Sequence, residues 1–77
     1  MRRKDLSSEF ARVLRAEREA KGLSQEALAH GAGLHRTYLG LVERGLRNPT
    51  IQVAHQLAQV LGMSLSEMIR VAERRLK

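Results

Sequence analysis

The segment 25–44, QEALAHGAGLHRTYLGLVER, constrains the fold of this chain more than any other part of it. Its pattern predicts a helix, a glycine turn and a second helix that crosses the first. Apolar residues occupy the positions where two such helices would touch: Leu28, Ala32, Leu34, Leu39 and Val42. Ala29 is small where the second helix is expected to pass closest, and Gly33 can adopt the positive φ of the turn at no steric cost.

A helix–turn–helix of this kind commonly places its second helix in the major groove of DNA. The net charge is consistent with DNA binding, because 14 Lys and Arg against 8 Asp and Glu give +6. Such a field favours a polyanionic partner, although it does not by itself distinguish DNA from RNA, from an acidic membrane or from a merely solvated surface. The chain has only one Phe and one Tyr. It therefore lacks the aromatic stacking platform that proteins usually use to bind single-stranded RNA.

Residues 1–77 are expected to form a single all-α domain, with five helices and no strand. A domain of this size buries only about 60% of its unfolded surface, so association with a second copy would stabilise it. The chain has no Cys, no apolar run near the roughly 20 residues of a membrane span, and no apolar signal core after its basic MRRK start. These features indicate a cytoplasmic, nucleoid-associated protein without a membrane contact.

Capping residues and glycines predict the helix boundaries. The first helix is expected to begin after Ser7 or Ser8 and to end at Lys21-Gly22. Four later helices are expected to start at these caps: Ser24, His35, Thr50 and Ser64. The last of them, at about 64–76, is the expected dimerisation helix.

Two helices carry features that need an explanation from packing. The helix after Thr50 is expected to point these residues inward: Ile51, Ala54, Leu57, Ala58 and Leu61. Gly40 interrupts the second helix of the 25–44 segment and costs about 1 kcal/mol of helix propensity relative to alanine. Its missing side chain would allow close approach of either DNA or a neighbouring helix.

Several strings along the chain together carry a family resemblance. They are GLSQEALA at 22–29, RTYL at 36–39, VERG at 42–45, RNPT at 47–50 and LG at 61–62. Across Glu9 to Ile69 the chain resembles the phage-repressor-like (Cro/C1, or XRE) helix-turn-helix regulators. The resemblance implies a five-helix lambda-repressor-like domain that binds double-stranded DNA as a homodimer and regulates transcription.

A narrower resemblance rests on HRTYL at 35–39, ER at 43–44, RN at 47–48 and TI at 50–51. These strings are similar to those of the controller (C) proteins of restriction–modification systems. Controllers are small dimeric transcription factors that set the timing of restriction endonuclease expression. Because the Arg-Thr-Tyr string also occurs in other branches of the family, an unspecified repressor or activator remains the alternative.

Both the resemblance and the chemistry place base reading at Arg36, Thr37 and Tyr38. Arg36 can donate two hydrogen bonds to guanine O6 and N7, and Thr37 can offer a hydroxyl to a base and a methyl group to thymine. Tyr38 can hydrogen-bond a phosphate or a base edge. The alternatives are a solvated or phosphate-bound Arg36 and a Tyr38 that only packs between the two helices.

Phosphate binding is expected from Gln25, His35, Arg47, Asn48 and Thr50. By resemblance, Gln25 anchors a phosphate at the start of its helix. Arg47 and Asn48 lie in a loop, and the Thr50 cap leaves backbone N–H groups free. His35 is either a helix cap, which we favour, or a phosphate donor. Arg44 could touch a phosphate or simply end its helix, and the sequence does not decide between these roles.

The resemblance also implies two structural roles. Arg18 and Glu43 are expected to form an ion pair that joins the first helix to the end of the reading helix. Four residues of the last helix are expected at a two-fold dimer interface: Leu65, Met68, Ile69 and Ala72. Such a dimer presents its reading helices about 34 Å apart, so the operator would be pseudo-palindromic.

Catalysis is not expected from this chain. Its three histidines, His30, His35 and His55, have no neighbouring residues that complete a metal set or a nucleophile–base pair, so neither a cofactor nor a metal is expected. RNA polymerase is a further expected partner only if the protein activates transcription. The alternative function is a protein-interaction module, such as an antitoxin or adaptor. Arg2, Arg3 and Lys4 form either a minor-groove arm or, as we favour, a basic tail.

Overall fold

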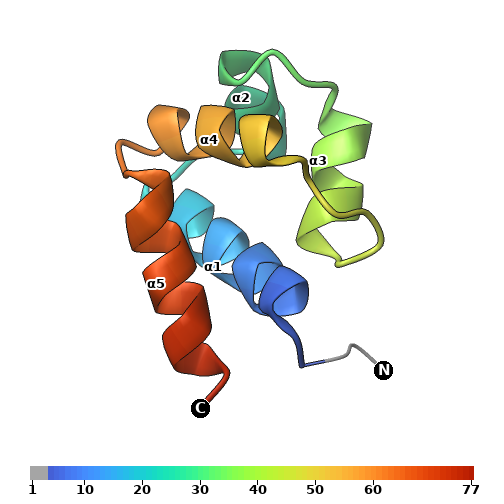
Figure 1. The fold of residues 1–77 in the computed structure, drawn as a ribbon. Helices are drawn as coiled ribbons and strands as arrows, with labels where there is room; N and C mark the ends of the chain where they lie inside the picture. Colours follow the sequence, from blue (N-terminus) through green and yellow to red (C-terminus); the bar gives the residue numbers. More distant parts are fainter. Residues whose placement is uncertain (1–3) are drawn as a thin grey trace.

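Five helices joined by short turns build the domain, and no strand occurs among residues 4–77, which the computed structural model describes. The helices are α1 (Leu6–Ala20), α2 (Gln25–Gly31), α3 (Arg36–Glu43), α4 (Ile51–Val60) and α5 (Leu65–Arg75). Helix α1 packs along α5 and against α3, while α2 contacts both α3 and α4 (Figure 1). The expected all-α class is confirmed.

The core lies where the five helices meet. Each helix contributes one large side chain that is completely buried: Leu14, Leu28, Leu39, Leu57 and Met68. Ala29 and Ala58 are also buried, and their small side chains allow the helices to approach closely. Because α3 is anchored by Leu39 and Val42 on one side only, its other side remains available to a partner.

Most of the predicted helix ends are correct. Ser24, His35, Thr50 and Ser64 each accept a hydrogen bond from a first-turn backbone N–H, so all four cap their helices. At Ser64 the arrangement is a full capping box, since Glu67 accepts in return from the Ser64 backbone N–H. Gly33 adopts φ +72°, as the turn was expected to require.

One predicted helix start and one predicted core residue are wrong. Helix α1 is capped by Asp5, whose carboxylate accepts from the Ser8 backbone N–H at 2.9 Å, so Ser7 and Ser8 lie inside the first turn. Ile51 was expected in the core, but 81% of it is exposed. It is the first residue of α4, and the apolar face of this helix is covered only from Val53 and Ala54 onward.

Candidate nucleic-acid interface

Helix α3 begins with a histidine cap that also fixes the tautomer of that histidine. The Thr37 backbone N–H donates to Nδ1 of His35 at 3.0 Å. A ring nitrogen that accepts carries no proton, so the neutral ring holds its proton on Nε2. His35 is exposed, and its Nε2–H is therefore a donor directed away from the cap. Capping and phosphate binding, which we considered as alternatives, are compatible.

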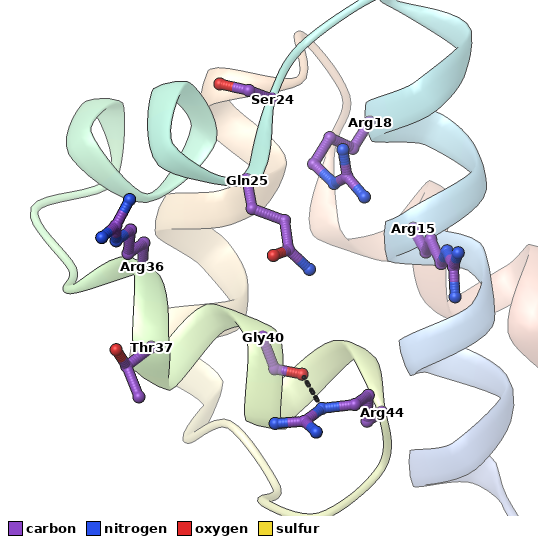
Figure 2. Close-up of a pocket in the computed structure, with 8 residues that line it drawn as sticks. All are labelled: Arg15, Arg18, Ser24, Gln25, Arg36, Thr37, Gly40 and Arg44. Carbon is purple, nitrogen blue, oxygen red and sulfur yellow. Dashed lines mark hydrogen bonds between the residues drawn. The ribbon is translucent and has the colours of Figure 1, made fainter.

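Arg36 and Thr37 follow the cap and are both exposed (Figure 2). The Arg36 side chain is 66% exposed, and its Nη1 lies 3.8 Å from an exposed Glu26 carboxylate oxygen. An ion pair this long and this accessible to water holds the guanidinium weakly. Tyr38 differs from both, because its half-buried ring packs against the core and helps to fix α3.

A buried ion pair ties the end of α3 to α1. Arg18 donates from Nε and Nη2 to the two carboxylate oxygens of Glu43, at 2.7 and 3.1 Å, and from Nη1 to the Leu23 carbonyl at 2.8 Å. The Arg18 side chain is 11% exposed and that of Glu43 only 2%. The hydrogen bond to Glu43 raises the pKa of Arg18, and burial opposes this shift. The structure thus brings together the two residues expected to pair.

Gln25 belongs to the same network, which the sequence did not suggest. Its Nε2 donates to Glu43 Oε1 at 2.9 Å, so the amide nitrogen faces the carboxylate. An amide nitrogen has two hydrogens, and the second is available to another acceptor. Glu43 therefore orients a side chain at the start of α2 as well as the guanidinium on α1.

An open groove between α1, α2 and α3 is lined by four arginines. Two of its residues, Arg36 and Thr37, are predicted base readers, and Gln25 is a predicted phosphate ligand. Figure 2 shows the eight residues that line it: Arg15, Arg18, Ser24, Gln25, Arg36, Thr37, Gly40 and Arg44. Sequence reasoning missed Arg15 and Ser24 as parts of this surface. The spacing of Arg15 and Arg18, three residues apart on α1, is the signal that could have found the first of them.

The other predicted phosphate ligands lie outside this groove. Arg47 and Asn48 are exposed in the loop between α3 and α4. Thr50 is exposed at the cap of α4, where its hydroxyl accepts from the Val53 backbone N–H at 3.0 Å. The predicted ligands therefore form two groups, one at the α1–α2–α3 groove and one at the start of α4.

The sequence profile of the family described as Helix-turn-helix (HTH_3) matches residues 14–68, which span α2, the turn and α3. The chain belongs to this family. The HTH_3 domain described here is 43% identical over 67 residues to the HTH-type transcriptional regulator y4dJ of Sinorhizobium fredii, covering 87% of this chain and 82% of that protein. Over 65 residues it is 42% identical to the control protein C.SmaI of Serratia marcescens, covering 84% and 77%.

A solved structure of a similar protein has the same fold. The HTH_3 domain superposes on the restriction–modification controller protein C.AhdI of Aeromonas hydrophila with a TM-score of 0.77 and 46% identity, covering 79% of this chain and 92% of that one. The resemblance to phage-repressor-like regulators and to controllers is thereby confirmed. The family is one of DNA-binding transcriptional regulators and not of enzymes.

The last helix of the HTH_3 domain only partly supports the expected dimer contacts. Met68 and Ala72 are fully buried within the monomer, so the prediction that they lie at a dimer interface is wrong. Their face of α5 closes the core against α1. Leu65 and Ile69 are only partly buried and remain candidates for a partner contact.

Among residues 4–77, no group of three or more His, Cys, Asp and Glu side chains could hold a metal ion. No helix within this range is long and apolar enough to cross a membrane. Of the basic N-terminal residues, Arg2 and Arg3 lie outside the described part of the chain.

Proposed function

We propose that this protein is a sequence-specific regulator of transcription that inserts α3 into the major groove of DNA. Arg36 and Thr37 read base edges, and the Tyr38 hydroxyl contributes a further contact. One observation carries the proposal: Arg36 and Thr37 are exposed at the start of a helix that the buried Leu39 and Val42 fix to the core. Base reading needs polar side chains that are accessible and yet held on a rigid element.

The phosphate contacts in this proposal come from both sides of α3. On one side, Gln25 offers its second amide hydrogen and His35 offers Nε2–H. On the other side, Arg47, Asn48 and the free N–H groups behind the Thr50 cap meet the opposite strand. These contacts set the register of α3 and supply affinity that depends on salt.

We propose further that the protein binds as a homodimer. The partly buried Leu65 and Ile69 of α5 supply apolar surface, and Val60 and Met63, at the end of α4 and in the turn after it, are also partly buried. A two-fold interface there would set the two α3 helices about 34 Å apart, one turn of DNA. The operator would then be a pseudo-palindrome.

Among regulators, the similarity to C.SmaI and C.AhdI favours a controller of a restriction–modification system. In that role the protein acts in the cytoplasm, on the nucleoid. It sets the timing of restriction endonuclease expression, and RNA polymerase is a second partner wherever the protein activates transcription.

Selection of bound sequences from a random duplex pool tests the proposal, with the mass of the protein in solution measured in parallel. Enrichment of one two-fold-symmetric site by a dimer is the expected result. Retention of duplex DNA without any enriched site would contradict sequence reading and would favour a protein-interaction module. Location of the selected site beside an endonuclease gene would separate a controller from other regulators.

Arg36→Ala and Arg47→Ala form a matched pair on that operator. Loss of Arg36 is expected to cost about 1–3 kcal/mol and to relax specificity at one base pair. Loss of Arg47 is expected to weaken binding to all sequences alike and to reduce the salt slope by about one unit. Equal weakening on every sequence by Arg36→Ala would remove its base-reading role.

A further inference from the structure

Nothing within the described fold requires a glycine at position 40. It lies in the middle of α3, where glycine is less favourable than alanine because it loses more backbone freedom on folding. Its φ is not among the positive values found at other glycines of the described chain, such as Gly33 at +72°. Conformation therefore does not require a glycine at this position.

Packing does not require it either. A Cβ built at Gly40 would meet only the Gln25 amide, at 3.8 Å from Oε1 and 3.9 Å from Nε2, which is ordinary van der Waals contact. Gly31 in α2 is the contrast, because a Cβ there would lie 3.2 Å from both Cγ atoms of Val60. Of the two explanations that the sequence left open for Gly40, approach by a neighbouring helix is thus excluded.

The surroundings of Gly40 indicate what approaches it instead. It lies in the basic α1–α2–α3 groove, with Arg15 and Gln25 on one side and Arg44 on the other (Figure 2). Arg44 donates from Nε to the Gly40 carbonyl at 3.2 Å, which holds this guanidinium beside the bare backbone. No carboxylate among the described residues pairs with Arg44, so its two terminal nitrogens can donate to an anion.

We propose that a DNA strand passes closest to the protein at Gly40, with its sugar–phosphate backbone against the bare face of α3 and its phosphates toward Arg44 and Arg15. The inference rests on the proposed DNA binding and adds to it a close-contact point and two phosphate ligands. A Cβ at position 40 would touch no part of the protein other than the Gln25 amide. It would hold the strand away from α3, and so would lift Arg36 from the base edges.

Two substitutions of one residue test this. Gly40→Ala is expected to raise Tm by about 4 °C or more, since alanine favours the helix and has room. On the operator selected by the wild-type protein it is expected to bind roughly tenfold more weakly, and Gly40→Leu more weakly still. Most ordinary substitutions that stabilise a helix leave binding intact, so this opposition of stability and affinity is the informative result.

Gly31→Ala and Gln59→Ala are the controls. Gly31→Ala forces Val60 to move and is expected to give no gain in Tm, so it is the control for stability. Gln59→Ala changes an exposed position of α4 outside the groove and should bind the operator as the wild type does, so it is the control for binding. The inference is overturned if Gly40→Ala binds the operator as tightly as wild type, or if it unfolds at a lower temperature. If the wild-type protein prefers no duplex, the proposed function fails as well, whereas tight wild-type binding with an unaffected Gly40→Ala rejects this inference alone.

Discussion

Two buried carboxylates, Glu43 and Glu9, hold the two ends of this domain in different ways. Glu43 pairs with Arg18, and both side chains are shielded from water. Glu9 is equally buried but accepts from Arg12 and from Arg75, whose side chains are 38% and 47% exposed. The first network fixes α3, and the second fixes the C-terminal turn of α5 to α1 at 2.9 Å between Arg75 Nε and Glu9 Oε1.

The two networks therefore differ in how readily they can rearrange. A buried ion pair is weakly screened by salt and expensive to break, so α3 is held in one orientation under most conditions. A pair with a half-exposed partner is screened, and its partner can return to water. Helix α3 is therefore more rigidly attached to α1 than the C-terminal turn of α5 is.

The largest effect is expected from Glu43→Ala. This change leaves the Arg18 guanidinium buried without its carboxylate, and breaking such a pair costs about 3–5 kcal/mol. Unfolding in urea, followed by circular dichroism, measures the loss. Glu17→Ala is the control, because Glu17 pairs with Lys21 across a partly exposed surface and should cost less than about 1 kcal/mol. Similar losses for the two variants would contradict the comparison.

A double variant separates stability from positioning. Replacing Arg18 by Met and Glu43 by Leu removes both charges, and exchanges of this kind are often neutral or stabilising. We expect the double variant to recover most of the stability that Glu43→Ala loses. It should still bind the operator less well than wild type, because Gln25 has lost the carboxylate that orients its amide. Full recovery of DNA binding would show that Glu43 acts through stability alone.

A smaller effect, sensitive to salt, is expected from Arg75→Ala. Its loss releases the last turn of α5 from Glu9, but Arg12 remains on the same carboxylate. The decrease in Tm should be clear at about 0.05 M salt and should shrink at about 0.5 M, as the half-exposed pair is screened. Arg74→Ala removes the same charge from the neighbouring exposed position and serves as the control. A decrease in Tm of the same size at both salt concentrations would contradict the screening of this network by salt.

The same two networks show how far the sequence could predict the structure. Caps such as Ser24 and Thr50 were predictable because the side chain bonds to backbone three residues away, so that the whole interaction lies in one short string. The resemblance implied the pair of Arg18 and Glu43. Nothing local could reveal the bond from Arg75 to Glu9, whose partners are 66 positions apart and meet only because α1 packs along α5.

At the candidate site, too, local features were predictable from the sequence and features that depend on helix packing were not. The base-reading role of Arg36 and Thr37 was expected from the resemblance and from the chemistry of side chains in the first turn of a helix. Arg15 and Ser24 were missed because a groove between three helices depends on how they cross. Met68 and Ala72 were misassigned because one apolar stripe can face either a core or a partner, and only packing decides between them.

The smallest expected effect is a loss of stability in acid that depends on the Glu9 network. The hydrogen bond from Arg75 holds the pKa of Glu9 below its ordinary value of 4.5; burial opposes the shift, and the charges of Arg12 and Lys4 support it. A carboxyl with a lower pKa in the folded chain binds its proton more readily when unfolded. Its stabilising effect is therefore complete above pH 4.5 and is lost as the pH falls through the folded value.

Thermal unfolding between about pH 5 and pH 3 is the measurement, with Glu9→Gln beside the wild type. The wild-type Tm should fall through this window, and the fall should be shallower in Glu9→Gln. Some slope should remain, because the backbone hydrogen bond from Ser64 also lowers the pKa of Glu67. Adding Glu67→Gln should flatten the curve further. An unchanged slope in Glu9→Gln would mean that the half-exposed arginines do not favour the ionised form, and Glu9 would then resemble an ordinary surface glutamate despite its burial.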